Sequence, residues 1–189
     1  MPSIKLAPSI LSADQDIINQ EIKLVEPFAG FIHVDIMDGK FVPQTTWTPE
    51  FVKTIKTKVP LDVHLMVENP SNEYLKSFID AGASSISIHQ ETCTDLLQSI
   101  NFIKKNKTKA CVAINPHTPL STIKQYLDLI DMVLIMTVEP GKAGQKFMTA
   151  PLKKVKELRK LKPNLDIEAD GGINKETIST SYNAGANVF

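Results

Sequence analysis

The sequence predicts a (β/α)8 TIM barrel, an α/β fold, with the eighth unit cut short. Short runs rich in β-branched and apolar residues recur at intervals of roughly 20 to 35 residues, and amphipathic stretches separate them. The first run and its turn, "APSILSAD", lack the glycine-rich turn that an open nucleotide-binding sheet would require. The alternation and the missing turn together favour a closed barrel of parallel strands.

Eight runs carry the strand pattern. They are residues 4–10, 31–36, 61–67, 85–90, 109–115, 132–138, 165–170 and 186–189. No linker or low-complexity tract interrupts them, so we expect a single barrel domain over residues 1–189. The last run stops before its loop and helix, and a barrel without a full eighth strand would expose sheet edges. The domain is therefore expected to be incomplete at its C-terminal end.

Helices are predicted where apolar residues return at helical spacing. Positions i, i+4 and i+7 are apolar in residues 18–25 and again in residues 96–103. Asn69 is expected to cap a further helix that begins at Pro70. A glycine that follows an alanine and precedes a strand is expected to end a helix in the left-handed conformation at Gly30, Gly82 and Gly185.

The composition argues against several classes of protein. The 21 Lys and Arg residues balance the 21 Asp and Glu residues, so no basic surface indicates nucleic-acid binding. Cys93 and Cys111 lie far apart without metal-ligand spacing, and the N-terminal segment lacks the pattern of a secretion signal. No apolar run reaches the roughly 18 residues of a membrane span. A cytoplasmic protein with reduced thiols is expected.

Polar residues gather where the predicted strands end. His33 and Asp35, His64, and Asp170 come from three different strands, and the carboxyl ends of barrel strands form the active face. Two imidazoles and two carboxylates suit zinc, manganese, iron(II) or cobalt. We therefore predict one divalent metal ion held by these four residues.

Other residues at the same face are assigned by their chemistry. Met37, Met66 and Met136 could form a deformable apolar wall of a pocket. His89 and His117 are expected to form hydrogen bonds or to be exposed rather than to bind the metal.

Two glycine clusters, "EPGKAGQKF" and "DGGIN", follow the sixth and seventh predicted strands. Asn174, at the end of the second cluster, is placed to cap the next helix, so backbone N–H groups there could bind an anion. Barrel enzymes often hold phosphate on the late loops of the barrel. These clusters therefore predict a phosphate site beside the carboxylates.

The chain resembles the ribulose-phosphate 3-epimerase family over essentially its whole length. The matching stretches are "APSILSAD", "HVDIMDGKFVP", "DVHLMVENP", "MTVEPG" with "GQKF", and "EADGGIN" with "NAGANVF". The resemblance implies interconversion of D-ribulose 5-phosphate and D-xylulose 5-phosphate in the pentose phosphate pathway. It implies that two bases move a proton at C3 through an ene-diolate, and it leaves open whether the chain forms a homo-oligomer.

The resemblance also assigns roles to residues. It places the metal on His33, Asp35, His64 and Asp170, and acid/base catalysis on Asp35 and Asp170. The implied substrate contacts are Ser9, His64, Gly141, Lys142, Ala143, Gly144, Asp170, Gly171 and Gly172, beside the methionine wall.

This sequence departs from the family pattern in the first glycine cluster. The family commonly has G-F-G-G-Q, whereas this chain has "GKAGQ", in which Ala143 would resist a positive φ and Lys142 could either meet phosphate or be solvated. Related epimerases of six-carbon ketose phosphates such as allulose 6-phosphate carry a similar alanine. That substrate and a catalytically inactive sugar-phosphate-binding homologue remain alternatives. Related decarboxylases and aldolases use a D-x-K-x-x-D strand. The corresponding stretch here, residues 33–38, contains no lysine, which argues against those activities.

Overall fold

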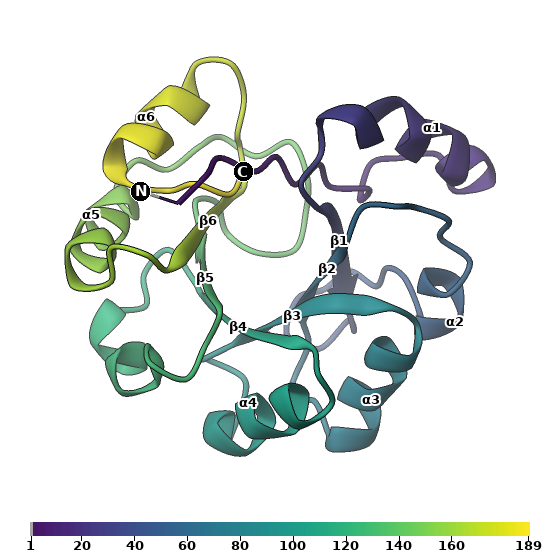
Figure 1. Cartoon of the computed structure of the whole chain (residues 1–189), viewed down its shortest axis with the longest axis horizontal. Helices are drawn as coiled ribbons and strands as arrows, with labels where there is room; N and C mark the ends of the chain where they lie inside the picture. Colours follow the sequence, from purple (N-terminus) through teal and green to yellow (C-terminus); the bar gives the residue numbers. More distant parts are fainter. Residues whose placement is uncertain (1) are drawn as a thin grey trace.

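The computed structural model describes residues 2–189 and shows a curled sheet of parallel strands with helices on its outside (Figure 1). The sheet has six strands in the order of the sequence, and every neighbouring pair is parallel. The strands are β1 (Ile32–Met37), β2 (Leu61–Met66), β3 (Ala83–His89), β4 (Lys109–Ile114), β5 (Met132–Met136) and β6 (Asp166–Asp170). The predicted alternation of strands and helices is confirmed for these six strands.

The helices cover the outer face of the sheet; α1 precedes β1, α6 follows β6, and the other four α-helices connect consecutive strands. They are α1 (Ile18–Val25), α2 (Pro49–Val52), α3 (Asn72–Asp80), α4 (Leu96–Lys105), α5 (Leu152–Leu161) and α6 (Thr177–Ala184). Short 3-10 helices are η1 (Gln15–Ile17), η2 (Glu26–Phe28) and η3 (Leu120–Tyr126). Among residues 2–189, no helix combines the length and the apolar character needed to cross a membrane.

The expected first and eighth strands appear only as isolated bridges. Lys5 pairs with Val188, Val188 pairs with Glu168, and Ser9 pairs with His33, all in parallel. Further backbone bonds join residues 5–7 to residues 187–189, including one of 2.6 Å from the Ala7 amide to the Phe189 carbonyl. Residues 5–9 and 187–189 therefore connect β6 to β1, and the two chain ends lie side by side (Figure 1).

We call the segments 5–9 and 187–189, which connect β6 to β1, the seam. The buried amide group of Asn187 holds the seam together through hydrogen bonds. Its Nδ2 donates to Asp166 Oδ1 at 2.8 Å and to the Ser3 carbonyl at 3.1 Å. Its Oδ1 accepts from the Ile167 amide at 2.9 Å and from Arg159 Nη2 at 2.8 Å. Because both donors and both lone pairs are used, one side chain holds the N-terminal segment, β6 and α5 together.

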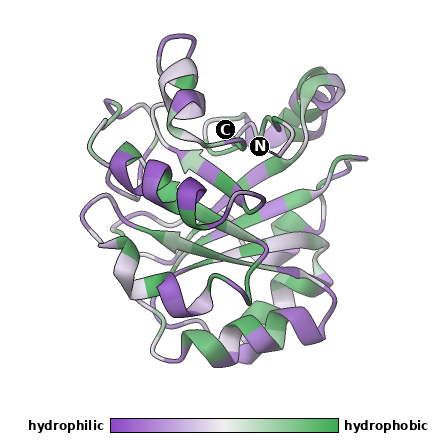
Figure 2. Cartoon of the chain, turned by 60° about the vertical axis from the view of Figure 1, so that its left-hand side comes forward, coloured by the Kyte–Doolittle hydropathy of each residue, from purple (hydrophilic) through white to green (hydrophobic). Residues whose placement is uncertain are grey.

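The strands divide their side chains between two faces. Aliphatic residues such as Ile32, Val34 and Ile36 point toward the helices and belong to one large core with Ile22 and Ile100. This pattern is visible in Figure 2, where hydrophobic stripes on the helices face the sheet. The alternate residues of each strand point inward, and this inner face carries the polar groups of the candidate site.

The predicted helix stripes are confirmed, but the helix ends predicted at Asn69 and Gly30 are wrong. Ser71 rather than Asn69 caps α3, since Ser71 Oγ accepts from the Tyr74 amide at 3.2 Å. Asn69 adopts a φ of 42° instead, and its side chain accepts from the Thr94 amide. Gly30 lacks a positive φ, and a Cβ there would lie 2.9 Å from the Lys5 Cβ. Its role is close packing at the seam.

The left-handed helix ends are confirmed at the other two glycines. Gly82 has a φ of 105° and Gly185 has a φ of 115°. Each follows directly on the last turn of its helix, α3 or α6, where a side chain would be strained.

Candidate active site

The register of β1 and β2 arranges the inward side chains in pairs. His33 lies opposite Asp62, Asp35 opposite His64, and Met37 opposite Met66. Residues two apart on a strand share a face, so each pair stands one step further along the inside of the barrel. His33 is the second residue of β1 and therefore does not lie at the strand's end, where the sequence analysis placed it.

The four predicted metal ligands converge. One ligand atom from each of His33, Asp35, His64 and Asp170 lies within 4.8 Å of all the others. His64 Nδ1 is 3.3 Å from Asp35 Oδ1 and 3.3 Å from Asp170 Oδ2. His33 Nε2 is 3.4 Å from Asp35 Oδ1 and 3.9 Å from Asp170 Oδ2. The fold thus brings together strands β1, β2 and β6 at one point.

These distances fit a divalent cation. Ligands at about 2.0–2.2 Å from a zinc ion would stand about 3.3–3.6 Å apart in a tetrahedron. His33 Nε2 is buried, has no hydrogen-bond partner among the described residues, and faces both carboxylates. Leaving such a nitrogen unpaired is costly, and a cation at the centre of the four groups would use its lone pair.

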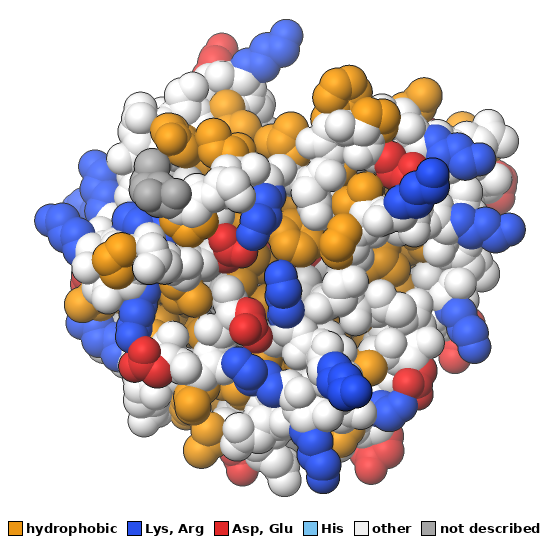
Figure 3. All heavy atoms as spheres, viewed as in Figure 1, with side chains coloured by type: hydrophobic (Ala, Val, Ile, Leu, Met, Phe, Trp, Pro, Cys, Tyr) orange, Lys and Arg blue, Asp and Glu red, His pale blue; other side chains and the backbone are white. Residues whose placement is uncertain are grey.

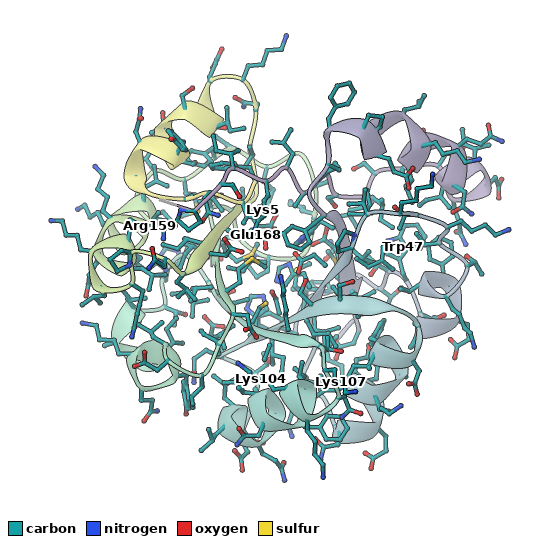
Figure 4. All side chains as sticks on the ribbon, viewed as in Figure 1. Lys5, Trp47, Lys104, Lys107, Arg159 and Glu168 are labelled. Atoms are coloured by element: carbon teal, nitrogen blue, oxygen red, sulfur yellow. The ribbon has the colours of Figure 1, made fainter. Side chains whose placement is uncertain are left out.

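Two carboxylates that the sequence analysis did not single out lie behind His33. Its Nδ1 is 3.0 Å from Asp62 Oδ2 and 3.2 Å from Glu168 Oε1. Asp62 also accepts from Ser85 Oγ at 2.5 Å. Figure 4 places Glu168 near the centre of the ring of strands. The signal was present in the sequence, because Asp62 and Glu168 stand two residues before His64 and Asp170 and so share their inward face.

The buried charges stabilise one another. Burial opposes the charged form of His33, but Asp35 and Glu168 outweigh it and hold its pKa well above the usual value. Burial likewise opposes the charge of Asp35, and His33 and His64 outweigh it, so its pKa is lowered. For Glu168, burial and the charge of Asp62 act in the same direction and raise the pKa to about 8. Asp35 is accordingly a carboxylate at neutral pH.

His64 is fully buried and touches a third histidine. Asp170 and Asp35 overcome the effect of burial and raise the pKa of His64 to about 9. On the other side of its ring, Nε2 is 2.9 Å from His89 Nε2. His89 thus forms hydrogen bonds, as expected, and exposed His117 pairs with Glu139 away from the four ligands.

A cavity of about 300 Å³ opens beside the four ligands. Ser9 stands at its edge and donates from Oγ to Asp35 Oδ2 at 2.6 Å. Of the residues predicted to contact substrate, His64 alone does not line the cavity, because it is buried beneath Asp35 and Asp170. The others that line it are Ser9, Met37, Met66, Met136, Gly141, Lys142, Ala143, Gly144, Asp170, Gly171 and Gly172.

The two glycine clusters form part of the cavity wall. Gly172 has a φ of 66°, and a Cβ there would lie 2.9 Å from the Phe147 backbone. The amides of Gly144, Gly171 and Gly172 donate no hydrogen bond within residues 2–189. Ala143 does not have a positive φ, so the predicted strain at this position is absent.

The N-cap predicted at Asn174 is two residues off, because the N-cap position of α6 is Glu176, which makes no side-chain capping bond. Asn174 instead binds the turn that leads into the helix. Its Oδ1 accepts from the Glu176 amide at 2.8 Å and from the Thr177 amide at 3.0 Å. These two amides are therefore already used, and an anion would meet the glycine amides before the helix instead.

The face shown in Figure 3 carries both basic and acidic side chains around its rim, and basic side chains predominate at its left edge.

Solved structures with a similar fold include those of another enzyme. The tryptophan synthase alpha-subunit of Pyrococcus furiosus superimposes on this chain with a TM-score of 0.75 at 13% sequence identity. The match covers 100% of this chain and 87% of that chain. At this identity the similarity establishes the parallel α/β barrel-like fold alone.

Sequence relatives are much closer. The model of the ribulose-phosphate 3 epimerase family matches residues 5–189. The ribulose-phosphate 3-epimerase of Bacillus subtilis is 48% identical over 194 residues, which cover 98% of this chain and 89% of that protein. The cytoplasmic isoform of Oryza sativa is 41% identical, with 98% of this chain and 84% of that protein covered. The chain therefore belongs to the ribulose-phosphate 3-epimerase family.

Proposed function

We propose that this protein is an isomerase that interconverts D-ribulose 5-phosphate and D-xylulose 5-phosphate by epimerisation at C3. The observation that carries the proposal is the convergence of His33, Asp35, His64 and Asp170 within 4.8 Å beside a cavity walled by glycine amides. Its relatives in Bacillus subtilis and Oryza sativa bear the name of this activity. The reaction belongs to the pentose phosphate pathway.

His33, Asp35, His64 and Asp170 would hold one divalent metal ion. Zinc, manganese, iron(II) and cobalt all accept such a mixture of nitrogen and oxygen ligands. Such an ion would supply positive charge that stabilises the negative charge developing on the substrate during proton removal. Asp62 and Glu168 keep the His33 ring in place from behind, so its Nε2 stays directed at the ion.

Asp35 and Asp170 are the proposed acid/base pair. Inversion at one carbon requires one group that removes a proton and another that returns it from the opposite face. Asp35 comes from β1 and Asp170 from β6, on either side of the seam, so the two carboxylates approach the cavity from different directions. Ser9 donates to Asp35 and fixes its orientation. Each group contributes about 10²–10⁴-fold to the rate.

The remaining cavity residues bind the sugar phosphate. The free amides of Gly144, Gly171 and Gly172 are suited to the phosphate oxygens. Lys142, in the same loop, adds a positive charge at this end of the cavity. The chain of the ketose would then lie along the apolar wall formed by Met37, Met66 and Met136.

We infer that the chain forms a single (β/α)8 domain and that it is located in the cytoplasm. Residues 4–10 and 186–189 take the places of the first and eighth strands of a single (β/α)8 domain, an inference supported by their bridges to β1 and β6. A cytoplasmic location is supported by the cytoplasmic isoform among the relatives, although a chloroplastic relative from Arabidopsis thaliana is 43% identical.

Metal removal tests the proposal. The purified protein should epimerise D-ribulose 5-phosphate, lose this activity on exhaustive chelation, and regain it when a divalent ion is returned. Turnover should be faster with the pentose phosphate than with allulose 6-phosphate. Full activity in metal-free protein would contradict the metal site, and faster turnover of the six-carbon substrate would assign the chain to that substrate.

Asp170→Asn tests the two-base assignment. The variant should lose epimerisation, yet Asp35 should still exchange the C3 proton of one epimer with deuterated solvent. Mass spectrometry of both epimers after incubation in deuterated water measures this exchange. Near-native turnover in both directions would show that Asp170 is not one of the two bases.

A further inference from the structure

A chain of hydrogen bonds leads from the candidate metal site toward the surface. It begins at His64, whose Nε2 is 2.9 Å from His89 Nε2, and continues from His89 Nδ1 to Glu91 Oε2 at 3.1 Å. The centres of the two rings are 5.0 Å apart and their planes differ by 22°. With nitrogens so much closer than ring centres, the imidazoles meet edge to edge, which is the geometry of a hydrogen bond between nitrogens.

The positions of the protons along this chain follow from chemistry. A carboxylate can only accept, so the proton between His89 and Glu91 resides on His89 Nδ1. A neutral imidazole has one N–H, and His89 Nε2 must then carry a lone pair. The proton between the two rings accordingly belongs to His64 Nε2. This leaves His64 Nδ1 able to offer a lone pair to a cation between Asp35 and Asp170.

Glu91 is in the charged state that this order requires. Bonds from His89, Thr118 and the Asn115 amide outweigh burial and lower the pKa of Glu91 to about 2, so Glu91 is charged. A charged acceptor strengthens and polarises the hydrogen bond that His89 Nδ1 donates.

The outer end of the chain is anchored on a loop. Glu91 Oε1 accepts from the Asn115 amide at 2.7 Å and from Thr118 Oγ1. Lys154 Nζ donates to the carbonyls of Asn115, Pro116 and Thr118 at 2.6, 3.1 and 2.9 Å. The loop therefore holds the carboxylate of Glu91 in one orientation, with its second oxygen directed at His89.

We propose that Glu91, acting through His89, is a positioning residue that fixes His64 in the tautomer able to bind metal through Nδ1. The inference rests on the metal site of the proposed function and extends it by two residues that do not touch the ion. Carboxylates that orient metal-binding histidines typically contribute 10–100-fold to metal affinity. Here the carboxylate acts one imidazole further away than in the usual arrangement.

Glu91→Gln should reverse the order of the protons along Glu91, His89 and His64, and it hardly changes the shape of the side chain. The Gln oxygen can still accept from Asn115 and Thr118, and its NH2 group then donates to His89 Nδ1. His89 Nε2 must carry the proton and donate to His64 Nε2, which moves the remaining proton of His64 onto Nδ1. Zinc titration of the metal-free protein by calorimetry should give a dissociation constant about 10–100-fold higher than for the wild type.

The matched control is Glu157→Gln, which removes a carboxylate from an exposed pair with Lys124. It should leave zinc affinity unchanged. The ¹⁵N shifts of the histidines in zinc-loaded wild-type protein supply an independent readout, and they should show protons on His64 Nε2 and His89 Nδ1. This measurement needs no variant, so it decides the question even if Glu91→Gln fails to fold.

The outcomes separate this inference from the proposed function. Two results would overturn the positioning role of Glu91 and His89 and leave the metal site intact, provided that wild type binds zinc. One is an unchanged zinc affinity in Glu91→Gln, and the other is a proton on His89 Nε2. A different result would contradict both the metal site and the positioning role of Glu91. In that case wild type binds no zinc, and zinc, manganese, iron(II) and cobalt all fail to support activity.

Discussion

The two faces of the sheet are equally buried but carry different chemistry. On β2, Val63 and Leu65 point toward the helices, while Asp62 and His64 point toward the barrel axis. All four side chains are fully buried. The outer face packs into a continuous apolar core. On the inner face, carboxylates, imidazoles and hydroxyls bond mainly to one another.

The difference shows how this fold separates stability from chemistry. Burying apolar side chains on the outer face stabilises the barrel, whereas burying charges on the inner face is costly unless each finds a partner. Six buried side-chain atoms lack a hydrogen-bond partner among the described residues, and three of them lie on the inner face: His33 Nε2, Ser87 Oγ and Glu168 Oε2. Half of the unsatisfied groups therefore lie on the face where His33, Asp35, His64 and Asp170 converge.

Among the changes considered, His64→Ala should cause the largest loss of zinc affinity and activity. It removes one of four proposed ligands and the link to His89, so zinc affinity and epimerisation should each fall by at least about 100-fold. The outer face is untouched, so cooperative thermal unfolding should persist. Calorimetric zinc titration and a coupled assay of D-xylulose 5-phosphate measure the effect. Native zinc affinity in this variant would remove His64 from the ligand set.

Leu65→Ala is the matching change on the outer face, at the next residue of the same strand. Leu65 is fully buried in the main core, so truncation should cost about 2–5 kcal/mol of unfolding free energy. Zinc affinity and kcat of the folded protein should stay near wild type. Urea unfolding followed by circular dichroism tests this. A large loss of kcat with unchanged stability would show that the two faces are not independent.

Gly172→Val should have an intermediate effect at the cavity wall. A side chain at a φ of 66° costs about 1–2 kcal/mol, and its Cβ would press on the Phe147 backbone. The loop must shift, so KM for the sugar phosphate should rise strongly while zinc affinity is preserved. Steady-state kinetics measures KM, and Gly82→Ala on the distant end of α3 serves as the strain control. An unchanged KM would mean that phosphate binds elsewhere.

The smallest expected effect is a pH dependence of stability from Glu91. The pKa of Glu91 is lowered to about 2 in the folded protein, so its stabilising contribution is complete above its unfolded pKa of 4.5. That contribution should disappear as the pH falls from 4.5 toward 2. Because Glu91 is partly exposed, the difference in unfolding free energy between wild type and Glu91→Gln should shrink by only about 1–2 kcal/mol. Urea unfolding at several pH values measures it. A constant difference would contradict the lowered pKa.

Much of the inner face was predictable because strand alternation is a local property. Once His33 and Asp35 stand two apart in an apolar run, they must share a face, and the same holds for His64 and Met66. The helix stripes of α1 and α4 were predictable for the same reason. Local periodicity does not reveal how far along a strand the site lies, and His33 was therefore placed too near the end of β1.

The sequence by itself determined the alternating order of elements, the two His and two Asp side chains that converge, and the glycine clusters at the cavity. Three contacts were decided only by the tertiary structure. Asn187 bonds to Asp166 across the seam, Asp62 and Glu168 both contact His33 Nδ1, and Glu91 connects to His64 through hydrogen bonds with His89. The physical reason is that strand and helix patterns follow from neighbours a few residues apart. A hydrogen bond between residues 25 positions apart, such as His64 with His89, exists only once the register of two strands has set the distance.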